Sequence, residues 1–229
     1  MSSTTPTSPP PPPAVSLTER RKAETRMEIA RAAAGLFVRQ GLRATRAEDI
    51  AQAAGIAPRT FYRYFASKEE AIGPLYATGA QRWVEAVRAA PAAVPLPRVL
   101  EDAVRHTLTP GVGVSAASWN WVRTLIRLAE ANPALRRVWA EACQASERYL
   151  TEALGERLTA GQVSDGSDNV AARARLGFAA AVASAAVRTA MESWAAGDDP
   201  AEGPRGPAEL ALGNLAALRD FPWDDVPGR

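Results

Sequence analysis

Hydrogen-bonding side chains gather on a short stretch of the chain that begins at Pro58. Arg59 and Arg63 are four residues apart, so on a helix their guanidinium groups lie on one side. A guanidinium can donate two hydrogen bonds to O6 and N7 of guanine or bind a phosphate, and the hydroxyl groups of Thr60 and Tyr62 can reach phosphate oxygens. These residue types indicate a surface that binds nucleic acid. The alternative is a solvated helix face.

Two short helices joined by a tight turn are predicted to position these groups. Thr45 and Glu48 have the spacing of a capping box, which begins a helix that ends near Gly55. A second helix over 58–64 follows, because Pro58 suits the first turn of a helix. A longer helix with one apolar face precedes both. The arrangement is typical of a helix-turn-helix, whose second helix enters the major groove.

Between residues 30 and 68 the small, apolar and aromatic residues follow a specific order. The positions that define it are Ala33, Leu36, Phe37, Gly41, Thr45, Ile50, Ala51, Ala54, Gly55, Ile56, Thr60 to Phe65, and Ser67 to Glu69. This pattern closely resembles the N-terminal domain of TetR-family transcriptional regulators. Many members have glycine where this chain has Arg59, so a side-chain contact is expected to replace a close backbone approach to DNA there.

The resemblance implies a set of residues that contact double-stranded DNA. They are Thr45, Arg46, Pro58, Arg59, Thr60, Tyr62, Arg63, Tyr64 and Lys68. Lys68 is expected to contribute a point charge toward phosphate, whereas Phe61 and Phe65 are expected to lie in the core. The basic cluster at 20–22 has two interpretations: an arm that reaches the minor groove or phosphates, or a solvated face.

The charge of the chain is divided unevenly, although its total is only +2. Residues 19–70 hold eleven basic and seven acidic side chains, a net charge of +4. The chain from Ala71 onward holds sixteen basic and eighteen acidic side chains, a net charge of −2. A basic unit on an acidic body indicates a polyanionic partner at one end.

Composition excludes several other classes of protein. The 229 residues are 47% hydrophobic and 23% charged, as in ordinary globular chains. Cys143 is the single cysteine and His106 the single histidine, so we expect no disulfide, no metal site and no cofactor. The default compartment is a reducing cytoplasm. The longest uncharged apolar stretch, 176–187, is too short to span a bilayer, which needs about 20 residues, so no membrane contact is expected.

The predicted fold is all-α, with an N-terminal helix-turn-helix DNA-binding domain followed by a helical ligand-binding and dimerisation domain, because apolar residues recur at intervals of three and four. Ser67 and Glu70 repeat the capping-box spacing before a fourth helix. Further helices are expected near 97–108, 115–131, 133–159, 169–196 and 208–220. The expected domains are a disordered Pro-rich tail at 1–18, the DNA-binding domain at 19–66, the ligand-binding and dimerisation domain at 67–222, and a flexible end at 223–229.

The resemblance implies a homodimer through the last two helices, near 169–196 and 208–220, and a ligand pocket in each body. Residues 176–190 support the dimer independently, since most are Ala, Gly, Ser or Val and permit close helix approach. The alternative is a core helix within one chain.

An aromatic and cationic set in the body provides candidates for the pocket. Its members are Trp119, Arg123, Arg127, Trp139 and Phe178. Trp119 and Trp121 are two residues apart and cannot share a helix face, so at most one of them is expected to line a pocket. Arg123 and Arg127 are four apart and either bind an anionic ligand or pair with acidic side chains.

These observations predict a ligand-responsive regulator, a repressor that a small-molecule effector releases from a palindromic DNA operator. The sequence does not identify the effector, the operator or the regulated genes. The alternative with the same fold is a DNA-binding or protein-interaction dimer that has no effector. An enzyme would need a site centred on His106, and we expect no catalytic residues.

Overall fold

The protein is described by a computed structural model over residues 16–112, 115, 118–159 and 169–218. Its helices are α1 (Leu17–Gln40), α2 (Ala47–Ala53), α3 (Pro58–Tyr64), α4 (Gly73–Ala89), α5 (Leu96–Leu108), α6 (Trp119–Ala131), α7 (Pro133–Thr159), α8 (Asn169–Ala196) and α9 (Pro207–Ala217). A 3-10 turn, η1 (Glu70–Ile72), precedes α4. The predicted all-α fold is confirmed.

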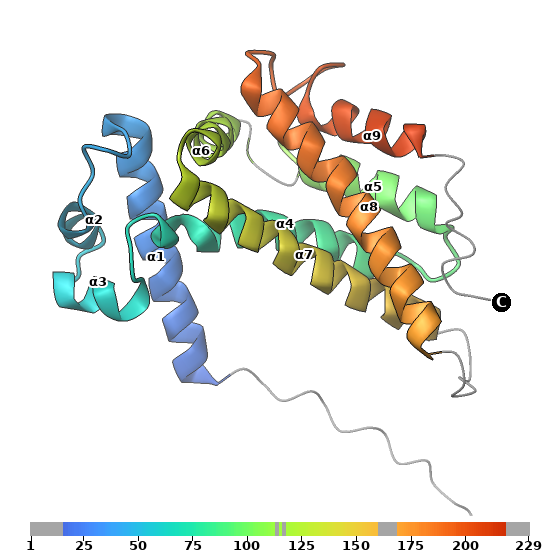
Figure 1. Cartoon of the computed structure of the whole chain (residues 1–229), viewed down its shortest axis with the longest axis horizontal. Coiled ribbons are helices and arrows are strands. Elements are labelled where there is room, and N and C mark those ends of the chain that lie inside the picture. Colours follow the sequence, from blue (N-terminus) through green and yellow to red (C-terminus); the bar gives the residue numbers. More distant parts are fainter. Residues whose placement is uncertain (1–15, 113–114, 116–117, 160–168, 219–229) are drawn as a thin grey trace, which may run out of the picture.

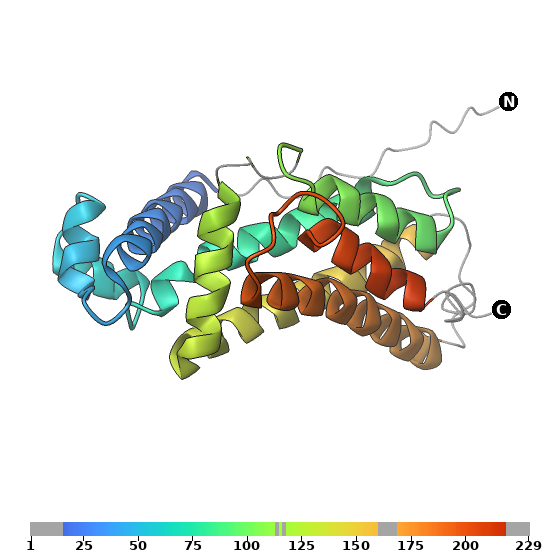
Figure 2. The same cartoon turned by 90° about the horizontal axis from the view of Figure 1, so that it is seen from above.

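The molecule is elongated, with the first three helices at one end. Figure 1 shows α1, α2 and α3 gathered on one side, while α4 and α7 run lengthwise away from them. Helices α5, α8 and α9 form the opposite end, and α6 lies between the two parts. Seen from above in Figure 2, α6 crosses the long axis between the first three helices and the rest of the body.

The predicted body helices agree closely with the observed ones. The bounds of α7 and α8 match the prediction, and α3 spans the predicted residues 58–64. Helix α6 begins at Trp119 rather than near 115, and α9 ends at Ala217 rather than near 220. Prolines begin α3, α7 and α9, as expected for a residue whose missing N–H has no partner in the first turn.

The predicted boundary of the N-terminal tail is wrong at its last residues. The Ser16 hydroxyl accepts a hydrogen bond from the backbone N–H of Glu19 at 3.2 Å, so Ser16 caps a helix that begins at Leu17. Residues 17 and 18 are therefore helical. The rest of the tail, 1–15, and the C-terminal segment 219–229 lie outside the described residues.

The capping box predicted from Thr45 and Glu48 is also wrong by one residue. The carboxylate of Asp49 accepts from the backbone N–H of Arg46 at 2.9 Å, so Arg46 is the residue that precedes α2. Thr45 cannot cap this helix because its hydroxyl donates to the carbonyl of Gly41 at 2.8 Å. The spacing of a capping box, with an acid three residues after the cap, is therefore present, but its members are Arg46 and Asp49.

The second predicted capping interaction is present but begins η1 rather than α4. The Ser67 hydroxyl accepts from the backbone N–H of Glu70 at 3.2 Å, and the Glu70 carboxylate accepts from the backbone N–H of Ala66 at 3.1 Å. Helix α4 starts only at Gly73, with Pro74 in its first turn.

Two apolar clusters hold the structure together, and the long helices contribute to both. We call α1, α2 and α3 the head. The head cluster contains buried residues of all three, including Phe37, Ile50 and Phe61, but also Leu125 of α6 and Leu135 of α7. The body cluster joins α4, α5, α6, α7, α8 and α9. The head predicted for 19–66 is therefore seated on the body through a shared apolar core.

A buried seam between α4, α6 and α7 fixes that seat. The hydroxyl of Tyr76 on α4 donates to the Leu125 carbonyl on α6 at 2.7 Å, and its ring meets Trp139 of α7 edge-on at 5.0 Å between centroids. Burial raises the pKa of Tyr76, and the nearby Cys143 adds to this rise. Burial, with a contribution from the charge of Glu192, raises the pKa of the Cys143 thiol to about 12.

We predict that Cys143 is nearly inert in the folded chain. Only the thiolate reacts with disulfide reagents, and a pKa raised from 9.0 to about 12 reduces the thiolate population at pH 8 by about 1000-fold. Reaction with an aromatic disulfide, followed by absorbance, should therefore be slower by two to three orders of magnitude than in about 6 M guanidinium. Equal rates in the two solutions would show that the seam does not bury this thiol.

Candidate nucleic-acid interface

A tight turn sets α3 across α2. The backbone N–H of Ile56 donates to the Ala51 carbonyl at 3.0 Å, and Gly55 between the helices has a φ of 68°. This left-handed conformation is open to glycine at little cost because glycine has no Cβ. The turn ends α2 and directs the chain into α3 with the geometry of a helix-turn-helix.

The inner side of α3 is an apolar anchor. Phe61 is fully buried and Phe65, just after the helix, is 3% exposed, and their ring centroids lie 5.8 Å apart. They pack in the head cluster with Ile50 and Ala51 of α2. The prediction that both phenylalanines belong to the core is confirmed, and burying them leaves the opposite side of α3 facing outward.

The outward side of α3 presents two arginines and a tyrosine. Arg59, Tyr62 and Arg63 are exposed, as is Pro58. Thr60 and Tyr64 are half-buried, and the guanidinium carbon of Arg63 lies 5.4 Å from the centre of the Tyr64 ring. The structure therefore brings the predicted hydrogen-bonding groups of α3 onto one exposed surface.

Glu48 of α2 borders this surface and was not predicted to do so. Its carboxylate pairs with exposed Arg46 at 3.5 Å and accepts from the Tyr62 hydroxyl, also at 3.5 Å. An acid beside a phosphate-binding surface opposes binding unless cations outweigh it. Glu48 therefore orients Arg46 and Tyr62 in the free chain.

The structure excludes Thr45 from direct contact with DNA. Its side chain is fully buried, its hydroxyl donates to the Gly41 carbonyl, and it accepts from the Gln40 amide at 3.3 Å. The predicted contact was wrong because the hydroxyl is used inside the turn between α1 and α2. Its position one residue before the exposed Arg46 gave no sign of this in the sequence.

Lys68 likewise has an internal role. Its ammonium donates to the carbonyls of Leu42 and Thr45 at 2.7 and 2.8 Å, and so holds the turn between α1 and α2 against the start of η1. Two of its three N–H groups are thereby occupied. The predicted phosphate contact thus gives way to a bracing contact as the main role of this side chain.

Arg26 performs a similar function that sequence analysis did not detect. Its guanidinium donates to the Tyr64 carbonyl at 2.8 Å and lies 4.4 Å from the centre of the Phe65 ring. A cation at this point satisfies a carbonyl at the C-terminal end of α3, where the helix dipole is negative. The pair is 38 residues apart in sequence, so no local pattern could have indicated it.

The residues predicted to line a ligand pocket are divided between two places: Trp119, Arg123 and Arg127 meet the end of α8, whereas Trp139 and Phe178 lie apart from them. Trp119 is 3% exposed and lies edge-on to Trp194, with 5.4 Å between ring centroids. Trp139 donates from its indole to Glu192 at 2.8 Å, and Phe178 is 62% exposed on α8. Trp121 is 40% exposed, so the two nearby tryptophans do occupy different faces of α6.

Arg123 and Arg127 are engaged by the chain itself. Arg123 donates to the carbonyl of Asp199, and Arg127 donates to the carbonyls of Ala195 and Gly197. Of the two interpretations drawn from the sequence, the one in which these arginines pair within the protein describes this structure, although backbone carbonyls provide most of the partners.

A hollow of about 380 Å³ lies elsewhere, between α4 and α5. Its lining includes Arg82, Glu85, His106 and Thr107. This places His106 at a surface hollow. Among the residues that the structure describes, no three His, Cys, Asp or Glu side chains form a group that could hold a metal ion.

Comparison with known proteins places the head in a family. Residues 29–71 match the family described as bacterial regulatory proteins, tetR family. The transcriptional regulator TcmR of Streptomyces glaucescens is 42% identical over 74 residues, which are 32% of this chain and 33% of TcmR. The transcriptional repressor KstR2 of Mycobacterium tuberculosis is 48% identical over 50 residues, 22% of this chain and 25% of KstR2.

The fold of the whole chain agrees. The structure of Thermus thermophilus FadR, a TetR-family transcriptional repressor in complex with lauroyl-CoA, is similar with a TM-score of 0.54 and 25% identity over 84% of this chain and 92% of FadR. The chain is therefore similar to TetR-family regulators, in sequence over residues 29–71 and in fold over most of its length.

The TetR relatives and structural neighbours are transcriptional regulators rather than enzymes, which argues against a catalytic site at His106. The match to the curated TetR-family relatives spans only a quarter to a third of their length, and the family model covers residues 29–71, which include α2 and α3. Within the matched residues 29–71, α3 carries the exposed arginines and tyrosine described above.

We predict that Arg59→Ala and Arg63→Ala each weaken binding to DNA selected in vitro by the wild-type chain. Loss of a bidentate contact to guanine costs about 1–3 kcal/mol, a roughly 5- to 150-fold increase in Kd. Fluorescence anisotropy with labelled duplexes measures this directly, and Arg148→Ala, which removes an exposed arginine of α7, is the matched control.

Lys68→Met should behave differently from these two variants. Because it removes two hydrogen bonds to backbone carbonyls, it should lower the thermal midpoint of unfolding, whereas Arg63→Ala should not. The opposite outcome would be wild-type stability together with a slope of log DNA affinity against log salt concentration that is smaller by about one unit. That result would show that Lys68 binds a phosphate, as the sequence predicts.

Proposed function

We propose that the chain is a transcriptional repressor that acts in the cytoplasm, binds a palindromic DNA operator as a homodimer, and is released by a small-molecule effector. The observation that carries the proposal is the exposed surface of Arg59, Tyr62 and Arg63 on a helix anchored by buried phenylalanines. Its position in a segment with a net charge of +4 favours a phosphate-bearing partner. Repression is the activity named for KstR2 and FadR.

Helix α8 supports dimerisation. Its stretch Val170–Ala196 is long and apolar enough to cross a membrane by length and composition, with a mean hydropathy of 1.4, yet only 28% of the most apolar part is buried within the chain. Ala179, Ala180 and Ala183 pack into the body cluster, which makes α8 an integral part of the globular fold. We therefore assign its remaining apolar side to a second copy of the chain.

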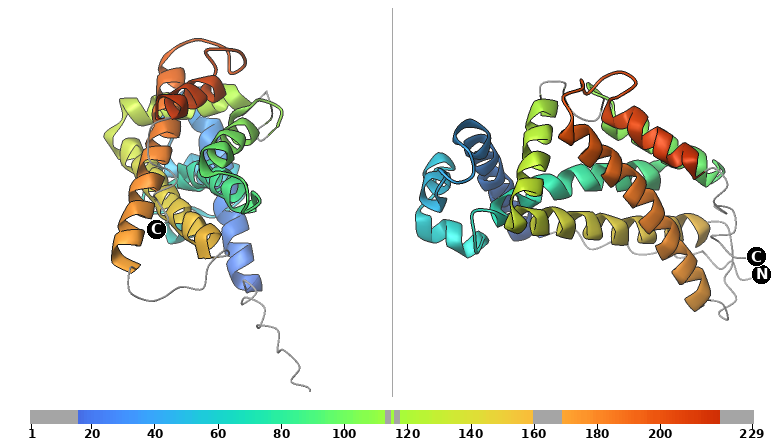
Figure 3. Two further views of the ribbon diagram at one scale, coloured as in Figure 1. Left: turned by 90° about the vertical axis from the view of Figure 1, so that its right-hand side faces the viewer. Right: turned by 45° about the horizontal axis from the view of Figure 1, so that its top comes forward.

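The outer side of α8 has the character of a helix interface. Figure 3 shows α8 along the outside of the body with α9 beside it. Ala174, Phe178, Ala181 and Ala185 recur at intervals of four, three and four, and none is buried. The Asn214 amide of α9 donates to the Ala186 carbonyl at 2.9 Å and fixes α9 on α8. Two such pairs related by a two-fold axis would form a four-helix interface.

We predict that Ala181→Glu converts the dimer to a monomer. A carboxylate at the centre of an apolar two-fold interface meets its symmetry mate, and both charges lose water. Sedimentation equilibrium should show the mass fall from two chains to one, while Ala140→Glu on the exposed side of α7 should leave the mass unchanged. A dimeric Ala181→Glu protein would place the interface elsewhere.

Unpaired polar groups in the body support an effector. The indole N–H groups of Trp83 and Trp119 and the hydroxyl of Thr107 are buried and make no hydrogen bond in the structure. Burying such groups without a partner costs about 1–3 kcal/mol each, which a ligand with polar atoms could recover. Thr107 also lines the hollow of about 380 Å³ between α4 and α5, a volume suited to a small molecule.

We predict saturable quenching of tryptophan fluorescence by an effector, accompanied by DNA release. Lauroyl-CoA is the first probe, because FadR binds it, followed by other acyl-CoA thioesters and by aromatic acids. Titrations should be repeated with the labelled duplex present, so that quenching and loss of anisotropy can be compared. A flat response across this panel would favour the alternative, a DNA-binding dimer that has no effector.

A further inference from the structure

Two arginines of α6 hold the C-terminal end of α8. Arg127 donates from Nε to the Ala195 carbonyl at 2.5 Å and from Nη2 to the Gly197 carbonyl at 2.6 Å. The last carbonyls of a helix have no partner within the helix, and the helix dipole is negative there. A guanidinium at this end therefore satisfies both the hydrogen bonds and the charge.

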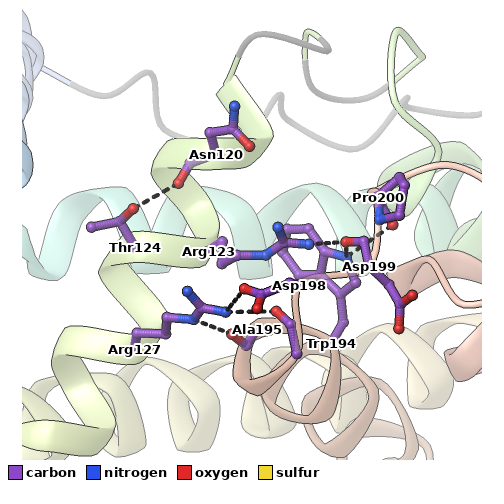
Figure 4. A network of polar contacts seen from close by, with 10 residues as sticks. Asn120, Arg123, Thr124, Arg127, Trp194, Ala195, Asp198, Asp199 and Pro200 are labelled. Atoms are coloured by element: carbon purple, nitrogen blue, oxygen red, sulfur yellow. Dashed lines mark hydrogen bonds and ion pairs between the residues drawn. The ribbon is translucent and has the colours of Figure 1, made fainter.

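Arg123 reinforces the same attachment one turn earlier on α6. Its guanidinium lies 4.2 Å from the centre of the Trp194 ring and donates to the Asp199 carbonyl. The Trp194 indole donates to that same carbonyl and to the Pro200 carbonyl, both at 3.1 Å. Figure 4 shows both arginines reaching from α6 to the end of α8 and the segment that follows it.

Asp198 completes the contact with an ion pair. Its carboxylate lies 2.8 Å from Nη2 of Arg127, and this hydrogen bond holds the pKa of Asp198 below its usual range. The carboxylate is therefore charged at neutral pH. We call the contact of Arg123 and Arg127 with residues 194–199 the α6 clamp.

The opposite side of α6 is attached to the head. Leu125 and Ala129 belong to the head cluster, whereas Trp119 and Ile126 belong to the body cluster. Trp121 lies against α1 at Gly35, where an added Cβ would be 3.5 Å from the Trp121 ring. Helix α6 thus connects α1 of the head to the end of α8, the helix to which we assign the dimer interface.

We infer that Arg123 and Arg127 are positioning residues for DNA binding: through α6 they fix the orientation of each head relative to the dimer interface, and so the spacing between the two α3 helices. This inference rests on the proposed function. Helix α7 also spans both clusters, and it meets α8 through apolar contacts and through one hydrogen bond, from the Trp139 indole to Glu192 at 2.8 Å. The α6 clamp holds the end of α8 by several directional hydrogen bonds, against the single one from α7.

The first experiment measures spacing preference. The wild-type chain selects duplexes from a random library, and the two half-sites of the selected operator are then moved apart or together by one base pair. Kd values from anisotropy give the ratio between the shifted and the selected spacing. In the wild-type chain, Kd should be higher at the shifted spacing than at the selected one. For Arg127→Ala we expect the ratio of these two Kd values to be closer to one, smaller than the wild-type ratio by about 5- to 150-fold, the usual range for coupling between sites. Arg148→Ala, with the same charge change, should keep the wild-type ratio.

Arg127→Lys separates charge from geometry and guards against a variant that does not fold. An ammonium keeps the favourable charge at the helix end but cannot place Nε and Nη2 on two carbonyls at once. We expect its spacing ratio to fall as in Arg127→Ala, with near-wild-type unfolding. Unchanged ratios in both variants would overturn the inference.

The second experiment needs no DNA. In a Cys143→Ser background, a nitroxide is attached at Glu28→Cys, an exposed position of α1. Pulsed electron resonance then measures the distance between the nitroxides on the two heads of the dimer. We expect a narrow distribution for the parent protein and a broadened or shifted one with Arg127→Lys. Identical distributions would overturn the inference while leaving the proposed function intact. Failure of the wild-type chain to select paired half-sites would instead overturn the proposed function, and the inference with it.

Discussion

The orientation of α3 depends on the shared apolar seat between the head and the body. Phe37 and Phe61 from the head are buried in one cluster with Leu125 and Leu135 from α6 and α7. A unit of one long and two short helices has little surface to bury by itself, so it gains rigidity by packing on α6 and α7. The same burial turns Arg59 and Arg63 toward solvent. Orientation of α3 and attachment of the head are thus two consequences of one packing arrangement.

Polar side chains then lock this arrangement at the ends of helices. Arg26 binds the last carbonyl of α3, Lys68 binds two carbonyls near the start of α2, and Arg127 binds those at the end of α8. Helix ends are where backbone groups lack partners, and charged donors form stronger hydrogen bonds than neutral ones. Arg26 and Lys68, two of the cations in the basic segment 19–70, therefore hold its shape, and fewer cations remain for the DNA contact that we propose. The surface available for that contact is narrower than the net charge indicated.

The candidate site was predictable as far as its chemistry was local. Spacing placed Arg59, Thr60 and Arg63 on one helix, and the structure exposes the two arginines on the side opposite buried Phe61. Thr45 was assigned to DNA from the family resemblance and Lys68 also from its charge, yet each is used by carbonyls of the turn between α1 and α2. Two of the residues predicted for the pocket are used in a similar way, because Arg123 and Arg127 bind backbone carbonyls about 70 residues away.

The sequence by itself determined the helices, the family of the head and the uneven charge, because helix periodicity, proline positions and net charge are properties of neighbouring residues or of simple sums. It also indicated that α8 carries small residues suited to close packing. Only the tertiary structure decided which polar groups face outward and which are consumed internally. That outcome depends on contacts between distant segments, such as Arg26 with Tyr64 and α6 with the end of α8, and no local pattern encodes the distance between them.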